Sequence, residues 1–423
     1  MSGRPVRVAL FPDSLNEING VANTCRNWVN YVHRNQFPML VVSAAGKTEF
    51  RQEGTISRLD LQRGPLAFSV EKDLGFDPTL VLFRYHKMVA KALREFRPEV
   101  VHITGPGDIG MMGAMIAHNL GIPIAASWQT NIHEYAARRA DLILPRWLSG
   151  NPRATLLQTI ERLSFRLAVL YYKAGRFHYA PNQELIDKLS AATGRPCSLM
   201  ERGVDLAMFN PAHRTRVNDG QFVIGYVGRL STEKKVRSFA GLAKAVQAAG
   251  YHHVKFVFVG HGAEEQWLSQ NIPNVEMTGV LRGDALSRAY ANMDLFAFYS
   301  ETDTFGNVVL EALASGVPAV VTDKGGPKYI VDHERCGFVC PSDEEFNASV
   351  LRLIAGSSLQ CDMAVAARQR AQRASWDAVF DSVYDAYRRH LPNPEATEHS
   401  ARFPADLDSA APQSLPLQAQ KQD

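Results

Sequence analysis

Short apolar runs that alternate with helical patterns constrain this chain more than any other feature, and the alternation occurs twice. In the first half we predict buried strands at 6–11, 40–44, 100–103 and 124–127, with helices at 79–96 and 109–119. In the second half the predicted strands are 222–227, 254–259, 275–277, 295–298 and 319–322, with helices near 236–248, 284–292 and 307–315. Such alternation is typical of parallel βαβ units. The sequence therefore predicts an α/β protein with two similar architectures in series.

The length of 423 residues also favours two domains, because one hydrophobic core seldom serves so long a chain. The predicted break lies near 202–211 and is followed by a polar stretch at 213–220. We expect an N-terminal domain over 1–207, a C-terminal domain over 208–375, a helix at 376–391 that packs back on the first domain, and a disordered tail over 392–423.

Composition excludes several classes of protein. With 46% hydrophobic residues and a net charge of +3, the chain resembles an ordinary globular protein and gives no reason to expect nucleic acid as a partner. No apolar stretch approaches the roughly 20 residues of a membrane-spanning helix, and we expect a cytoplasmic protein. The cysteines lack metal-ligand spacing, so we expect reduced thiols and no metal site: Cys25, Cys197, Cys336, Cys340 and Cys361.

Two loops at the ends of predicted strands carry residues suited to phosphate. Gly228, Arg229 and Lys234 follow the strand at 222–227, and ligands of open α/β sheets bind at the carboxyl ends of strands. The glycine permits close backbone approach, and the two cations offer positive charge to a diphosphate. The next strand ends in a second glycine pair, Gly260 and Gly262. Taken alone, cations after a strand are usually solvated, and that alternative stays open.

A third segment follows the strand at 295–298 and opens the helix near 307. Gly306 and Asn307 would direct free N–H groups, at the positive end of the helix dipole, towards phosphate oxygens. Asp303 precedes this turn and Glu311 lies about one turn inside the helix, so the two acids can bind hydroxyls at two ends of one ligand. The alternative is an acid that caps the helix and a solvated glutamate.

These motifs together resemble family-4 glycosyltransferases with the GT-B fold, and the resemblance extends over roughly 6–390. It rests on Gly228-Arg229-Leu230 with Glu233-Lys234, Gly260-His261-Gly262, the segment from Asp303 to Glu311, and Gly325-Gly326-Pro327. It is greatest to lipid-directed mannosyl- and sulfoquinovosyl-transferases. The resemblance implies two Rossmann-like domains that face each other across a cleft.

The implied activity is the retaining, metal-independent transfer of a hexose from a nucleotide-diphosphate sugar to a lipid or glycan hydroxyl. GDP-mannose is the expected donor, and because it is a substrate no cofactor is expected. UDP-glucose or UDP-sulfoquinovose is the alternative donor. A nucleotide-sugar-binding protein with impaired catalysis is the alternative from another class.

The resemblance also implies a role for each motif residue. Arg229 and Lys234 would hold the diphosphate, Glu311 the ribose, and Asp303 the transferred sugar; the family often has glutamate at this last position, which predicts a changed sugar preference. The remaining donor contacts would come from Phe305, Gly306 and Asn307 by their backbone, Val280 and Leu281 against the base, and Gly20 from the opposite domain.

The first half of the chain holds the expected acceptor side. Relatives usually carry histidine where this chain has Gln129, which can hydrogen-bond but cannot carry charge or relay a proton. His133, four residues on, is expected to compensate. Asp13 and His102 each lie at a predicted strand end and are candidate acceptor residues, with a turn-forming aspartate and a lone structural histidine as the alternatives.

A basic helix is predicted at 155–173. Arg162, Arg166 and Lys173 lie on one of its faces and could dock on anionic lipid headgroups. The alternative is a helix whose apolar stripe faces the core and whose basic back is solvated; that stripe consists of Leu156, Ile160, Leu163, Leu167 and Leu170. The expected partners are thus a nucleotide-diphosphate sugar, a lipid or glycan acceptor and an anionic membrane surface.

Overall fold

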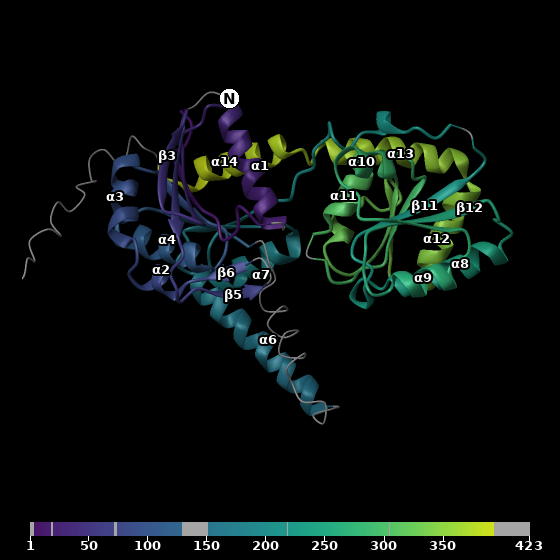
Figure 1. Cartoon of the computed structure of the whole chain (residues 1–423), viewed down its shortest axis with the longest axis horizontal. Helices are drawn as coiled ribbons and strands as arrows, with labels where there is room; N and C mark the ends of the chain where they lie inside the picture. Colours follow the sequence, from purple (N-terminus) through teal and green to yellow (C-terminus); the bar gives the residue numbers. More distant parts are fainter. Residues whose placement is uncertain are drawn as a thin grey trace, which may run out of the picture.

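Two α/β domains lie next to each other along the long axis of the molecule (Figure 1). The computed structural model describes residues 4–17, 20–71, 74–128, 151–217, 219–303 and 305–392. The expected tail from 393 onwards is outside the described residues.

The N-terminal domain is built on an eight-stranded sheet with the order β10-β9-β8-β7-β1-β2-β4-β3. All neighbouring strands pair in parallel except β3, which is antiparallel to β4. The central strands are buried, as expected of parallel strands covered by helices. The strands are β1 (Val8–Phe11), β2 (Met39–Ala45), β3 (Glu49–Glu53), β4 (Ile56–Gln62), β7 (Val100–Ile103), β8 (Ile124–Ser127), β9 (Phe177–Ala180) and β10 (Cys197–Leu199).

One helix prediction in this domain is wrong. The segment 79–96 forms two helices, α2 (Pro78–Leu82) and α3 (His86–Phe96), because Tyr85 adopts a left-handed conformation with φ of +63° that an α-helix cannot include. The other elements are α1 (Gly20–Arg34), α4 (Asp108–Asn119), α6 (Asn151–Tyr172), α7 (Gln183–Thr193) and the hairpin of β5 (Phe68–Glu71) and β6 (Leu74–Phe76).

The C-terminal domain has a six-stranded parallel sheet with the order β13-β12-β11-β14-β15-β16. From β11 the chain adds β12 and β13 on one side of the sheet, and β14 then begins the other side next to β11. Ligands of open α/β sheets bind at such a switch in strand order. The strands are β11 (Phe222–Val227), β12 (Val254–Val259), β13 (Val275–Gly279), β14 (Leu295–Phe298), β15 (Ala319–Thr322) and β16 (Gly337–Cys340). The helices are α8 (Phe239–Ala248), α9 (Glu265–Asn271), α10 (Gly283–Ala291), α11 (Asn307–Ala314), α12 (Asp343–Ala355) and α13 (Ser357–Gln372).

The last helix, α14 (Trp376–His390), returns to the N-terminal domain and lies beside α1 (Figure 1). The rings of Trp28 and Phe380 stack with their centroids 5.4 Å apart, and the Tyr31 hydroxyl donates a hydrogen bond to Asp381. The chain therefore passes between the domains twice. The two passages pair as an isolated bridge between Val204 and Ser375, which places a two-stranded connection at one edge of the cleft.

Among the described helices, none by itself has the length and hydropathy to cross a bilayer. The pair α12 and α13, bent by 105° at its break, meets the length and composition requirement only when the two are taken together.

Candidate active site

An ion pair between Lys234 and Asp303 lies at the carboxyl edge of the C-terminal sheet. The Lys234 ammonium donates to Asp303 Oδ2 at 2.8 Å, and the two side chains are only 13% and 25% exposed. Lys234 belongs to a 3-10 turn after β11, and Asp303 lies in the loop after β14. These strands are neighbours at the switch point, so the parallel topology brings the two loops together.

The N-terminus of α11 adjoins this ion pair. Gly326 N donates to the carbonyl of Asp303 at 2.7 Å and holds the loop that leads into the helix. Phe305 and Gly306 are buried, and Asn307 Oδ1 is a buried oxygen that has no hydrogen-bond partner among the described residues. The free N–H groups of this helix end, with the positive end of its dipole, suit a phosphate.

Glu311 lies one turn inside α11. The Tyr290 hydroxyl donates to Glu311 Oε2 at 2.8 Å. Burial raises the pKa of Glu311 to about 6, and the hydrogen bond from Tyr290 opposes that rise. The carboxylate is therefore mostly ionised at neutral pH and can accept hydrogen bonds from hydroxyls.

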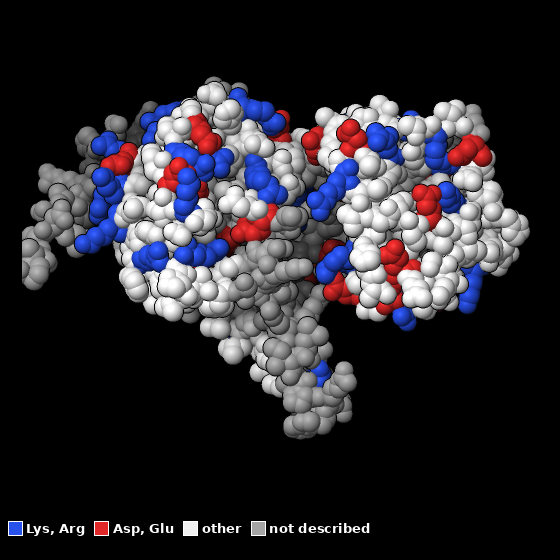
Figure 2. Space-filling view, in the orientation of Figure 1, with Lys and Arg blue, Asp and Glu red and all other residues white. Residues whose placement is uncertain are grey.

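Arg229 differs from Lys234 in its surroundings. Its side chain is 74% exposed, and its guanidinium pairs with Glu233 at 2.6 Å on the same turn of chain. Exposed ion pairs contribute little to stability, so this arginine can exchange its partner at low cost. Figure 2 shows basic side chains on both domains beside the groove that separates them.

The glycine loops after β11 and β12 pack directly against each other. Gly228 N donates to the carbonyl of Val259, and a Cβ on Gly260 would lie 1.9 Å from the Gly228 carbonyl oxygen. Gly260 is thus required by loop packing. The segment with Val280 and Leu281 lies next to these loops, because Gly260 N donates a hydrogen bond to the carbonyl of Gly279. A Cβ on Gly262 would lie 2.2 Å from the Leu230 carbonyl oxygen. The loops after β11, β12 and β13 therefore form one continuous edge of the C-terminal domain.

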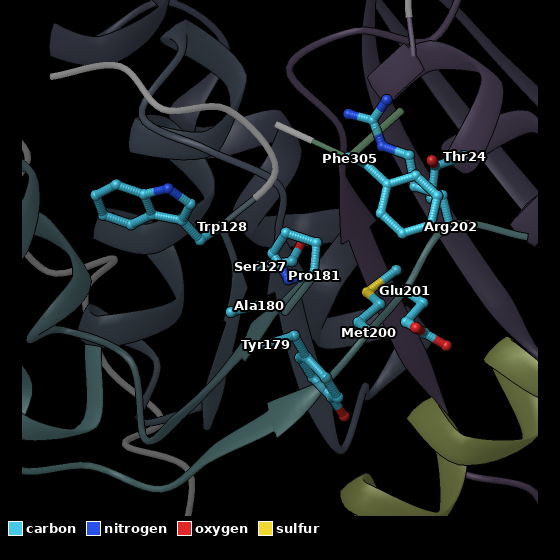
Figure 3. Close-up of a pocket in the computed structure, with 10 residues that line it drawn as sticks. All are labelled: Thr24, Ser127, Trp128, Tyr179, Ala180, Pro181, Met200, Glu201, Arg202 and Phe305. Carbon is cyan, nitrogen blue, oxygen red and sulfur yellow. The ribbon is translucent and has the colours of Figure 1, made fainter. Parts of the chain in front are cut away.

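Arg202 is a site residue that the sequence analysis missed. Its Nη1 would lie 2.1 Å from a Cβ on Gly20, at the start of α1. Burial lowers the pKa of Arg202, and the negative charge of Asp303 opposes that effect. Arg202 also lines a small pocket with Thr24 and Phe305, one from each domain (Figure 3). One arginine thus connects the glycine turn of the first domain with the acid of the second.

Asp13 lies at the carboxyl edge of the N-terminal sheet. Its Oδ2 accepts from Gly107 N at 3.1 Å, whereas its buried Oδ1 has no hydrogen-bond partner among the described residues. Burial raises the pKa of Asp13 to about 7, and nearby Asp108 adds to the rise. Asp108 itself pairs with Arg63 through two hydrogen bonds of 2.8 and 3.1 Å. Asp13 can therefore donate to or accept from a hydroxyl near neutral pH.

His102 lies in the core, away from any surface that an acceptor could reach. It is fully buried, its Nδ1 lies 2.7 Å from the Tyr387 hydroxyl, and its Nε2 lies 3.0 Å from the Ser127 hydroxyl. Burial lowers the pKa of His102 to about 3. We accordingly leave His102 out of the site. Gln129 and His133 lie outside the described residues. Within the described ranges, no cluster of three or more His, Cys, Asp or Glu side chains could hold a metal ion.

Comparison with known proteins agrees with this geometry. Residues 18–207 match the family model "Glycosyltransferase Family 4", and residues 221–356 match "Glycosyl transferases group 1". A GDP-mannose-dependent alpha-mannosyltransferase of Mycobacterium tuberculosis is 30% identical over 398 residues, which cover 90% of this chain and 96% of the relative. The chain belongs to glycosyltransferase family 4. This family-4 enzyme is also 27% identical to a sulfoquinovosyl transferase of Arabidopsis thaliana, over 90% of the chain and 73% of the relative.

Solved structures place the fold of this family-4 glycosyltransferase. A glycosyltransferase of Rickettsia africae superposes with a TM-score of 0.66 at 14% identity, over 92% of this chain and 99% of the other. Anabaena HepE in complex with UDP gives 0.63 at 17% identity, over 91% and 100%. The predicted GT-B fold with two Rossmann-like domains is thereby confirmed.

Proposed function

We propose that this glycosyltransferase transfers mannose from GDP-mannose to a lipid or glycan hydroxyl, with retention of the anomeric configuration. The observation that carries the proposal is the line of groups from Lys234 through Asp303 to Glu311 along one sheet edge. A nucleotide sugar carries its diphosphate between the sugar and the ribose, so it would need a cation for the diphosphate and acids for the hydroxyls of the sugar and of the ribose. The choice of donor is supported by three relatives named GDP-mannose-dependent alpha-mannosyltransferase, at 27–30% identity.

The chemistry follows from exchange of partners at the ion pair. Lys234 would leave Asp303 for the diphosphate and, with Arg229, stabilise the charge that develops on the leaving group. Asp303 would then accept hydrogen bonds from hydroxyls of the sugar. Arg202 would add positive charge from the other side of the cleft. We propose that the acceptor hydroxyl attacks on the face from which the diphosphate departs.

We further propose that neither a metal nor a cofactor takes part. Lys234, Arg229 and Arg202 supply positive charge of the kind that a metal ion gives in other transferases. On the acceptor side, Asp13 would bind the attacking hydroxyl. Its Oδ1 is buried and has no hydrogen-bond partner among the described residues, so it can accept a hydrogen bond from a ligand.

UDP-sulfoquinovose is the second candidate donor, and the name of the Arabidopsis relative favours its sugar. That name is sulfoquinovosyl transferase, and the match covers 90% of this chain and 73% of the relative. The two candidate donors differ in their nucleobase and in their sugar.

A thermal-shift panel of GDP, UDP and their sugars tests the donor. A ligand that binds only the folded state raises Tm, so GDP and GDP-mannose should raise Tm more than UDP, UDP-glucose and UDP-sulfoquinovose. Glu311→Gln is the matched control, because ribose is common to all of these ligands and every shift should shrink together. A larger shift with the UDP compounds would replace GDP-mannose by the second candidate.

A further inference from the structure

Helix α6 projects from the N-terminal domain, and its far end extends below both domains in the view of Figure 1. Its buried residues Ala168 and Tyr172 pack in the core of the domain. On the same helix, Leu163, Leu167 and Leu170 are 57%, 60% and 67% exposed. The alternative in which this stripe faces the core is therefore wrong for these leucines. Apolar side chains that gather at such spacing on a surface mark an interaction site.

The geometry of α6 separates three faces. At about 100° per residue, Leu163, Leu167 and Leu170 fall within one narrow band, roughly opposite the packed face that carries Ala168 and Tyr172. The exposed cations fall in a second band next to the leucines and consist of Arg162, Arg166 and Lys173. An apolar band bordered by long cationic side chains is the pattern of helices that lie in the interface of a membrane.

A groove runs beside this face, between α6 and α7. Its volume is about 390 Å³, and its lining is mainly apolar, with Val169, Leu167 and Leu170 from α6 and Ala192 from α7. Arg166 and Lys173 also line it. An apolar groove with two cations matches an acyl chain attached to an anionic headgroup.

We propose that α6 docks on a bilayer that contains anionic lipid. Leu163, Leu167 and Leu170 enter the boundary between headgroups and acyl chains, and Arg162, Arg166 and Lys173 contact the lipid phosphates. Charge complementarity selects this occupant over a second copy of the chain, which would bring its own three cations to the same interface. This proposal rests on the proposed function in one respect: a lipid acceptor would give the enzyme a reason to dock on a bilayer.

Co-sedimentation of the full chain with vesicles tests the proposal. Phosphatidylcholine vesicles with phosphatidylglycerol should bind the protein, and vesicles of phosphatidylcholine alone should bind it much more weakly. Replacing Arg162, Arg166 and Lys173 by serine should weaken binding about a hundredfold, since each cation near such a surface contributes severalfold. Replacing Leu163, Leu167 and Leu170 by serine should weaken binding at least tenfold, even at low salt.

Val365→Ser is the matched control, because Val365 is 61% exposed on α13 in the other domain. It should bind vesicles as the natural protein does. All variants should keep the Tm shift with GDP-mannose, which separates failure of docking from failure of the proposed function. The proposal is overturned if the leucine variant binds vesicles normally, if the natural protein stays in solution, or if sedimentation shows a dimer that the leucine variant abolishes.

Discussion

Lys234 and Asp303 pair at 2.8 Å across the ends of two neighbouring strands, and the proposed donor would contact each of them with a different part of its structure. The pair keeps two charges together in a place where little water reaches them. A nucleotide sugar would separate the pair and give each member its own partner. Arg229 is paired with Glu233 in an exposed contact, so the exchange of its partner would cost less.

This difference predicts unequal effects of two substitutions. Lys234→Ala and Arg229→Ala should each lower kcat at saturating donor by more than tenfold, since loss of one charge-assisted contact to the leaving group costs about 2–4 kcal/mol. Only Lys234→Ala should also lower Tm, because it leaves Asp303 half-buried without its cation. Kinetics and thermal melting of both variants check this, and near-normal turnover in both would remove these cations from the mechanism.

Arg202 should act together with Gly20. Arg202→Met removes the charge that faces Asp303, and we expect a lower kcat with a smaller change in the KM for donor. Gly20→Ala places a Cβ 2.1 Å from Arg202 Nη1, so it should displace the same guanidinium. Because both changes act on one contact, their effects on kcat/KM should be non-additive by roughly 0.5–3 kcal/mol. Simple additivity in a double-mutant cycle would show that the two residues act separately.

Asp13 should make the protein less stable as pH rises. The pKa of Asp13 is raised from 3.8 to about 7 in the folded state, so the folded protein binds more protons than the unfolded chain between these values. Stability from this group is therefore lost as pH rises from about 4 to about 7 and stays lost above. Asp13→Asn should be more stable than the natural protein at pH 8, by up to a few kcal/mol, with the advantage shrinking towards pH 4. Urea unfolding at both pH values measures it, and a constant difference would contradict the assignment. Glu311→Gln serves as the comparison, because the pKa of Glu311 is raised less than that of Asp13, so its stability difference between the two pH values should be smaller.

Sequence reasoning succeeded where short-range patterns decide the structure. Continuous apolar runs identified β1, β7 and β11, and parallel topology then placed the loops after β11 and β14 at one edge. It failed where the pattern is mixed: β9 contains His178 within a buried strand, and the left-handed Tyr85 breaks a helix without any glycine or proline as a signal.

Neither the role of Arg202 nor the orientation of α6 could be predicted from local sequence patterns. Arg202 acquires its role from the way two domains meet, which no local pattern records. The only signal was a cation in the segment between two α/β domains. Helix α6 has apolar residues both on its packed face and on its exposed face, so periodicity alone could not tell which face meets the core.

Turnover should survive removal of divalent metals. If Lys234, Arg229 and Arg202 together carry the leaving-group charge, excess EDTA should leave the transfer rate unchanged within error. Loss of activity that magnesium or manganese restores would show that a metal ion shares this role. Rate measurements before and after dialysis against EDTA provide the check.

The most direct test of the central claim is the identity and anomeric configuration of the product. The purified protein is incubated with GDP-mannose and a lipid acceptor carrying a free sugar hydroxyl, and the product is analysed by NMR. We predict an α-mannoside, which retains the configuration of the donor, and at least tenfold less product from the Lys234→Ala variant in the same time. A β-mannoside, or transfer from UDP-glucose or UDP-sulfoquinovose with none from GDP-mannose, would contradict the account.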